Sequence, residues 1–229
     1  MAETKFHIRE VCHNPTDGDF IVAAFDSALP HLASVGCGDQ WGSTPFSERA
    51  EYRRRMYDSI PLSEASRLNQ DGNSEHARLF IAEVETHHAS DLQGLSFRTD
   101  DHGNRFLSVG AAFVRENWWP GYLKAHDSTK SIFENANADG AFCYVELLIS
   151  DFRTGTARKG AGAALLQSAR AYSVSRGAKA LYLDCWAGNG GSLVEFYTGQ
   201  GFVKAANFSI ERPDSEDWPG SLVKLELET

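Results

Sequence analysis

The chemically most informative stretch of the sequence is a glycine-containing turn, Arg158-Lys159-Gly160-Ala161-Gly162-Ala163, between an apolar run and a helical pattern. The first turn of a helix has unpaired backbone amides, and the helix dipole adds about half a positive charge there. The two glycines let the backbone approach a ligand closely, and the two basic residues add positive charge. This pattern indicates a diphosphate site, and the alternative is a plain strand-to-helix connection.

Two commoner phosphate motifs do not fit this turn. A Walker A loop needs Gly-Lys-Ser/Thr at its end, and Gly160 is followed by Ala161 and Gly162. A dinucleotide fingerprint needs a third glycine, and Leu165 occupies that position. The turn is therefore neither a nucleotide triphosphate loop nor a dinucleotide loop.

Glu146 is the second candidate, because it lies inside the apolar run over 142–152. A buried carboxyl group is costly without a partner, and burial is expected to raise its pKa toward that of a general base. Strand alternation places Tyr144, Glu146, Leu148 and Ser150 on one face, with Glu146 about 13 Å from Ser150. The alternative is a glutamate that only pairs with an arginine or a hydroxyl group.

Metal, disulfide and covalent chemistry receive little support. The four cysteines, Cys12, Cys37, Cys143 and Cys185, are widely spaced, and no two of them form a Cys-x-x-Cys pair. Adjacent His87 and His88 would point to opposite faces of a strand. We therefore expect no metal site, and we expect Cys185 to be an inert buried thiol, with a nucleophilic role as the lesser alternative.

The net charge of −9 disfavours binding to nucleic acids and favours a cationic amine. No apolar run is long enough to cross a bilayer, and the first residues do not resemble a secretory signal. The sequence therefore predicts a cytoplasmic protein.

These residues must be positioned by an alternation of strands and helices. Strands are expected at 6–11, 77–85, 106–115, 142–152, 179–184, 202–211 and 222–228. Helices are expected at 17–34 with an interruption at Pro30, at 47–59 with Ser47 as N-cap, at 161–176 and at 192–198. The remaining long segments are a hairpin loop over 87–105 and an insertion over 117–140 that is partly helical around 128–134.

Trp118, Trp119 and Tyr122 in this insertion allow two interpretations. They could form an aromatic wall around an amine or an apolar group. They could equally pack the insertion onto the sheet or onto a second subunit, which leaves a homodimer open.

The segment 144–208 resembles the core of the GCN5-related N-acetyltransferase (GNAT) superfamily. The phosphate motif of that family, Gln/Arg-x-x-Gly-x-Gly/Ala, falls on Ala157 to Gly162. A helix, a strand ending at Leu183-Asp184, and the patterns Asn189-x-x-Ser192 and Phe196-Tyr197-x-x-x-Gly201-Phe202 follow in the order of the family. Ala157 departs from the motif, and Arg158 is the neighbouring side chain that could replace the missing contact.

The resemblance implies an α+β domain over 1–229, with a mixed, mostly antiparallel sheet splayed at its central strands and flanked by helices on both faces. It implies acetyl-CoA as co-substrate and direct acetyl transfer to a primary amine of a small molecule or peptide. Glu146 would be the base and Tyr197 the acid. The expected CoA contacts are Leu148, Ile149, Ser150, Arg158, Lys159, Gly160, Ala161, Gly162, Ala163, Asn189 and Ser192, with Asn189 alternatively only a helix N-cap.

Two other functions remain open at this point. A CoA-binding regulatory module would keep the fold without turnover, and Ala157 favours this alternative mildly. An O-acyltransferase would use the same base with an alcohol acceptor.

Overall fold

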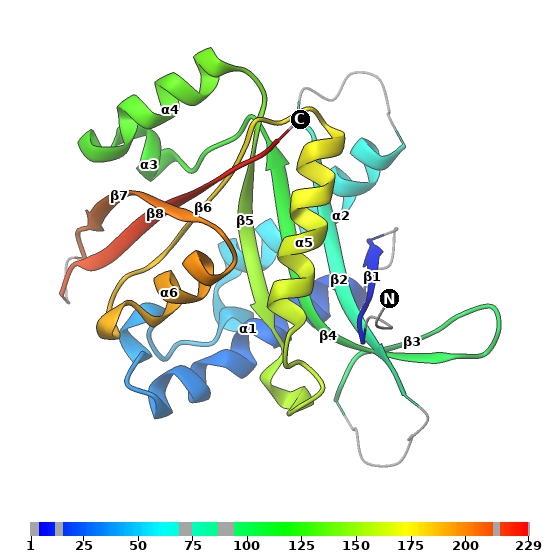
Figure 1. Ribbon diagram of the computed structural model, residues 1–229. Coiled ribbons are helices and arrows are strands. Elements are labelled where there is room, and N and C mark those ends of the chain that lie inside the picture. Colours follow the sequence, from blue (N-terminus) through cyan, green and yellow to red (C-terminus); the bar gives the residue numbers. More distant parts are fainter. Residues whose placement is uncertain (1–4, 12–15, 69–74, 87–93, 213–215, 229) are drawn as a thin grey trace. The chain divides into compact units, whose positions relative to one another are not determined.

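The fold is described by a computed structural model that covers residues 5–11, 16–68, 75–86, 94–212 and 216–228. The chain forms two compact units. The first comprises residues 1–31, 43–113 and 147–168, and the second comprises residues 32–42, 114–146 and 169–229. The helices α1 and α5 and the strands β4 and β5, which are labelled in Figure 1, each contribute residues to both units.

Eight strands form one sheet in the order β1-β2-β4-β5-β6-β8-β7, with β3 beside β4. Their bounds are β1 His7–Glu10, β2 Ala77–Glu85, β3 Phe97–Thr99, β4 Arg105–Glu116, β5 Phe142–Ser150, β6 Ala180–Trp186, β7 Val203–Ile210 and β8 Trp218–Glu226. β1–β2, β3–β4, β6–β8 and β7–β8 are antiparallel, and β5–β6 is parallel. The parallel ladder joins only residues 142–144 to residues 180–182. The predicted mixed, mostly antiparallel sheet is confirmed.

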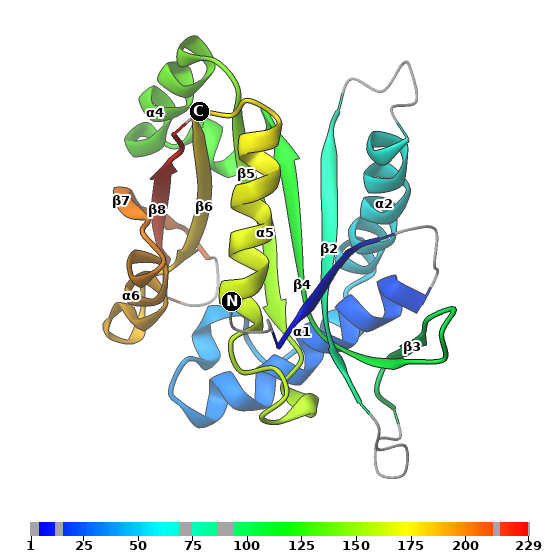
Figure 2. The same ribbon diagram turned by 45° about the vertical axis from the view of Figure 1, so that its right-hand side comes forward.

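The helices are α1 Thr16–Ser34, α2 Ala50–Arg67, α3 Gly121–Ala125, α4 Asp127–Asp139, α5 Ala161–Ser175 and α6 Ser192–Gly199. Short 3-10 turns lie at η1 Gly38–Gln40, η2 Phe46–Glu48, η3 Phe152–Thr154 and η4 Asn189–Gly191. In the first unit, α1 and α2 lie on the side of β2 and β4 opposite to the start of α5 (Figure 2).

The start of α5 packs closely on β4 because of a glycine. A Cβ atom on Gly110 would lie 2.8 Å from the carbonyl oxygen of Ile149 and 3.2 Å from Leu165. Ala161 and Leu165 are fully buried there, as the predicted apolar stripe of α5 requires. A side chain at position 110 would therefore push away the helix that carries the glycine turn.

A buried ion network joins β1 to β2 in the first unit. Glu83 is fully buried and lies between two guanidinium groups, with Arg9 at 2.5 Å and Arg98 at 2.6 Å. Arg9 also donates two hydrogen bonds to Asp17 at the start of α1. The charged groups of this network all pair with one another within the first unit, so none of them is buried without an opposite charge.

The segment 117–140 is mostly helical and contributes side chains to the hydrophobic core of the second unit. Trp119 is 1% exposed and packs against Tyr144 and Tyr182. The buried members of this aromatic cluster are Trp119, Leu123, Ala136, Phe142, Tyr144, Ala180, Tyr182, Phe208 and Leu222. For Trp119, packing of the insertion onto the strands is therefore the correct alternative, whereas Tyr122 remains 44% exposed.

Tertiary contacts also override three local predictions. α1 continues through Pro30, and α2 begins at Ala50 and continues through Pro61. Ser47 is not the N-cap of α2, because the helix begins later and its N-cap is Arg49, which makes no side-chain capping hydrogen bond. Ser47 lies instead in the 3-10 turn η2, where the Asp26 side chain of α1 accepts from the amides of Phe46 and Ser47.

The 87–105 segment contains a strand that the sequence did not indicate. β3 pairs with β4 across a tight turn in which the Asp100 side chain accepts from the amides of His102 and Asn104. Residues 87–93, which include His87 and His88, lie outside the described part of the chain.

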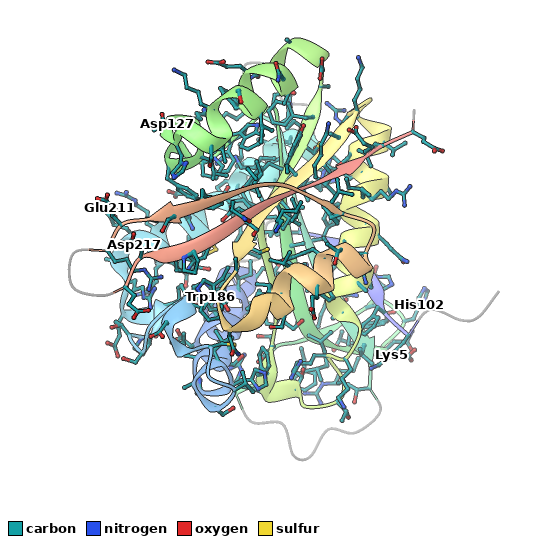
Figure 3. The ribbon with its side chains drawn as sticks, turned by 60° about the vertical axis from the view of Figure 1, so that its left-hand side comes forward. Lys5, His102, Asp127, Trp186, Glu211 and Asp217 are labelled. Carbon is teal, nitrogen blue, oxygen red and sulfur yellow. The ribbon has the colours of Figure 1, made fainter. Side chains whose placement is uncertain are left out.

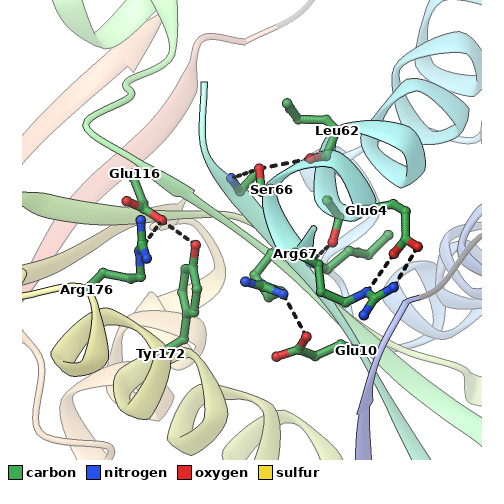
Figure 4. Close-up of polar contacts among 12 residues, drawn as sticks. Glu10, Leu62, Glu64, Ser66, Arg67, Glu116, Tyr172 and Arg176 are labelled. Atoms are coloured by element: carbon green, nitrogen blue, oxygen red, sulfur yellow. Dashed lines mark hydrogen bonds and ion pairs between the residues drawn. The ribbon is translucent and has the colours of Figure 1, made fainter. Parts of the chain in front are cut away.

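The far end of β4 is tied to α5 within the second unit. Glu116 accepts hydrogen bonds from the Tyr172 hydroxyl group and from Arg176 (Figure 4). Figure 4 also shows Ser66 of α2, which donates to Leu62 and accepts from the amide of Ala77.

The Glu83 network makes a stability prediction. Glu83→Gln removes the negative charge between two buried guanidinium groups and should lower the free energy of unfolding by about 3 kcal/mol. Glu10→Gln removes the partly exposed partner of Arg78 and should cost under about 1 kcal/mol. Urea denaturation of both variants measures these changes. Equal losses of unfolding free energy would show that the buried network contributes no more than the exposed ion pair.

Candidate active site

The exit of β5 is fixed by Asp151, which is fully buried. Its carboxylate accepts from the backbone amide of Arg153 at 3.0 Å and from the guanidinium group of Arg153. Its own amide donates to the carbonyl of Val109 on β4. The chain therefore leaves β5 in a defined direction before it reaches the glycine turn.

The turn joins α5 through a backbone conformation that only glycine adopts at little cost. Gly160 has φ +94°, in the left-handed region, and Ala161 begins the helix. Within the described residues, the amides of Gly162 and Ala163 bond to no backbone carbonyl, whereas Ala164 bonds to the carbonyl of Gly160. Unpaired amides at a helix start can donate to an anion, so this geometry fits the predicted diphosphate site, which stays a prediction.

The residues just before β1 contact this turn, and the sequence did not indicate that contact. Lys5 Nζ donates to the carbonyls of Thr156 and Lys159 at 3.3 and 3.4 Å. The ring of Phe6 lies 3.2 Å from the position that a Cβ atom on Gly160 would take. Lys5 and Phe6 lie some 150 residues before the turn, so no local pattern could have connected them.

The two basic residues of the turn differ in their surroundings. The guanidinium group of Arg158 stacks 3.7 Å from the ring centroid of Phe152, and its Nε atom is buried without a partner in the described structure. Burial lowers the pKa of Arg158, and the charge of Asp151 partly offsets this. Lys159 is exposed. Whether Arg158 compensates for Ala157 stays a prediction.

The last residues of β5 alternate as expected for a strand. Leu147 and Ile149 are buried, whereas Leu148 and Ser150 are partly exposed. Leu148 and Ser150 thus share a face with Glu146, which is also partly exposed. In the first unit, the structure brings Leu148, Ile149 and Ser150 onto the strand that leads into the turn.

Glu146 belongs to the second unit and pairs with Arg115 of β4. The Oε2 atom of Glu146 lies 3.1 Å from Nη1 of Arg115, and the two side chains are 6% and 13% exposed. The same guanidinium group lies 4.0 Å from the ring centroid of Trp118. The arginine partner of the alternative interpretation is therefore present, and the role of Glu146 as a base stays a prediction.

A second carboxylate near Glu146 was not recognised in the sequence. Asp184 of β6 accepts hydrogen bonds from the hydroxyl groups of Tyr122, at 2.9 Å, and Tyr144. Burial raises the pKa of Asp184, and the two hydroxyl donors oppose this effect. Asp184 ends the predicted strand 179–184, and only the tertiary fold places two tyrosines on it.

Tyr197 of α6 is buried, with 6% of its surface exposed. Burial raises its pKa, and the neighbouring Cys185 and Asp184 raise it further. The hydroxyl group therefore keeps its proton throughout the neutral range. Burial also raises the pKa of the Cys185 thiol to about 12, as expected for an inert cysteine.

Asn189 and Ser192 lie at the start of α6. Asn189 adopts a positive φ of 47°, and its side-chain amide donates to the carbonyl of Val35 at 3.0 Å. The N-cap of α6 is Gly191, so the predicted N-cap role of Asn189 is wrong. Ser192 is exposed at the first position of the helix. A CoA contact by either residue stays a prediction.

No group of three or more histidine, cysteine, aspartate or glutamate side chains suited to a metal ion occurs in the part of the chain that the structure describes. Among the same residues, no helix is both long and apolar enough to span a bilayer. Cys12, His87 and His88 lie outside this part.

Comparison with known proteins identifies the fold. No protein-family model matches the sequence, and no curated protein is recognised as a relative. Solved structures match over nearly the whole chain. A candidate phosphinothricin N-acetyltransferase is 17% identical with a TM-score of 0.54, and the match covers 98% of this chain and 99% of that one.

Two further structures name the family and its cofactor. A candidate acetyltransferase of the GNAT family from Desulfovibrio desulfuricans is 13% identical, with a TM-score of 0.52 and coverage of 97% and 99%. A candidate acetyltransferase from Salmonella typhimurium, yncA, was solved with its cofactor acetyl-CoA and is 13% identical, with a TM-score of 0.53 and coverage of 98% and 95%. The chain therefore has the GNAT fold, and the resemblance seen in the sequence is confirmed at the level of the fold.

The glycine turn makes a stability prediction. Gly160→Ala places a β-carbon in the left-handed region and against Phe6, and should cost about 1–2 kcal/mol of unfolding free energy. Gly199→Ala is the control, because a β-carbon there meets nothing within 4 Å and φ is not positive. Chemical denaturation measures both, and an unchanged stability of Gly160→Ala would contradict the assigned conformation.

Proposed function

We propose that this chain is an acetyl-CoA-dependent N-acetyltransferase of the GNAT superfamily, with residues 1–229 acting as one catalytic domain. The observation that carries the proposal is the set of unpaired amides after Gly160, at the start of α5, in a chain with the GNAT fold. The acetyl-CoA present in yncA supports the choice of cofactor.

The residues of the turn fit the diphosphate of coenzyme A. The amides of Gly162 and Ala163 are available as donors, Gly160 and Ala161 shape the approach, and Arg158 and Lys159 add positive charge. Farther along β5, the backbone of Leu148, Ile149 and Ser150 would hold the pantetheine arm by strand-like hydrogen bonds. Acetyl-CoA, when bound, supplies an activated thioester. Asn189 and Ser192 complete the proposed contacts.

The acceptor nitrogen must be neutral before it can attack the thioester carbonyl. An alkylamine is neutral in only about one molecule in 2,500 at pH 7, so a base is useful. We assign this role to Glu146, whose carboxyl group pairs with Arg115. Glu146 takes one proton from the ammonium group, and the neutral nitrogen then forms the C–N bond as the C–S bond breaks. Tyr197 gives its proton to the leaving sulfur and regains one from the nitrogen, which thereby loses its second proton, and Glu146 releases its proton to solvent.

The burial of Tyr197 has two consequences for that last step. Its raised pKa ensures that the hydroxyl group is protonated when the thiolate leaves. It also makes Tyr197 a weaker acid than an exposed phenol, so Tyr197→Phe should slow transfer less than the loss of Glu146.

Thiol release from acetyl-CoA, measured with a panel of primary amines and a panel of alcohols, tests the proposal. We expect release with amines and a mass increase of one acetyl group on the acceptor. CoA binding without release would identify a regulatory CoA-binding module, which Ala157 favours. Release only with alcohols would identify an O-acyltransferase.

The role of Glu146 gives a pH-dependent prediction. Glu146→Gln should reduce turnover about 100-fold at pH 7, and the deficit should shrink as pH rises toward the pKa of the amine, where the base is no longer needed. CoA affinity should stay within twofold of the parent, about the precision of calorimetry. Exposed Glu134→Gln is the matched control. Unchanged turnover between pH 6 and 9 would remove Glu146 from the mechanism.

Direct transfer predicts that Cys185 is dispensable. With a pKa of about 12, its thiol is ionised in only about one molecule in 100,000 at pH 7. Cys185→Ala should therefore keep most of the turnover, and no acetylated cysteine should accumulate in mass spectra of the parent mixed with acetyl-CoA. Loss of turnover in a stably folded variant would instead support an acyl-cysteine path.

A further inference from the structure

The second unit holds a carboxylate that the proposed reaction does not use. β5 and β6 pair last at Tyr144 and Tyr182, and Glu146 and Asp184 each lie two residues beyond that pair. Tyr144 donates a hydrogen bond to Asp184 and lies two residues before Glu146 on the same face of β5. The two carboxyl groups therefore both lie close to Tyr144.

The charges of these two carboxylates are balanced differently. Glu146 pairs with Arg115, whereas no lysine, arginine or histidine in the described structure forms an ion pair with Asp184. Both tyrosine hydroxyl groups donate to the same atom of Asp184, Oδ1. Part of the Asp184 residue remains exposed to solvent. A partly buried carboxylate without a counter-charge favours a cation.

The residues around Asp184 suit an organic cation. Tyr122 contributes an aromatic ring that is 44% exposed, and Trp118 already stacks on the guanidinium group of Arg115. Such rings attract ammonium groups through their faces. The adjoining Trp119 is 1% exposed and packs against Tyr144.

We propose that Asp184, with Tyr122 and Tyr144, binds a second ammonium group of the acceptor, so that the substrate is a diamine or a longer polyamine. The inference rests on the proposed acetyl transfer. The nitrogen that attacks the thioester must lose its charge at Glu146, so a cation held by Asp184 is another group of the same molecule. An acceptor with a carboxylate near its amine would instead be repelled by Asp184.

Calorimetry without CoA tests the site independently of catalysis. The probes are α,ω-diaminoalkanes of three to eight carbons, each compared with the n-alkylamine of the same length. At one or more lengths the parent should bind the diamine at least about tenfold more tightly than the monoamine, as expected for one additional charge pair.

Asp184→Asn is the decisive variant, because an asparagine still accepts hydrogen bonds from both tyrosines. It should lose the preference for the diamine and keep its affinity for the monoamine. Asp217→Asn removes an equal charge from the exposed start of β8 and should keep the preference (Figure 3). Urea denaturation establishes that both variants are folded.

The outcomes separate this inference from the proposed function. No diamine preference at any length, or a preference that survives in folded Asp184→Asn, overturns the polyamine site even if thiol release with monoamines is found. An Asp184-dependent preference without thiol release upholds the amine site and removes the transferase function.

Discussion

Backbone amides at the start of α5 are the element on which the account of this protein depends. They are unpaired because the helix begins there, and they are positioned because Gly160 takes a left-handed conformation after the buried Asp151 has fixed the exit of β5. Gly110 allows the helix to pack closely enough on β4 for this geometry to persist. Side chains contribute less, since Lys159 is exposed and Arg158 is stacked on Phe152. The loss of the usual glutamine or arginine at Ala157 is therefore compatible with anion binding.

Electrostatics organises the second unit around two carboxylates with different partners. Glu146 pairs with the positive charge of Arg115, whereas two tyrosine hydroxyl groups donate to Asp184 without adding a charge. Burial raises the pKa of Tyr197, so this hydroxyl group holds its proton in the neutral range.

Local patterns predicted α5, its glycine-containing start and every strand except β3, although β8 begins earlier than expected, because periodicity and turn chemistry are encoded over a few residues. They failed where a distant residue decides. Ser47 lies in a 3-10 turn whose amides bind Asp26 of α1, so α2 begins later, and Asn189 donates to Val35 instead of capping α6. The partners of Asp184 could not be found in advance for the same reason, because they come from two other elements, α3 and β5. Glu146 was recognised because a charged residue inside an apolar run is conspicuous.

The most direct test of the central claim is a titration of the isotopically labelled protein with coenzyme A, followed by the backbone amide signals in nuclear magnetic resonance spectra. The account predicts saturable shifts that are largest at Gly160, Ala161, Gly162 and Ala163, as expected for amides that donate to a diphosphate. Binding that leaves these four signals in place, or no binding at millimolar coenzyme A, would contradict it.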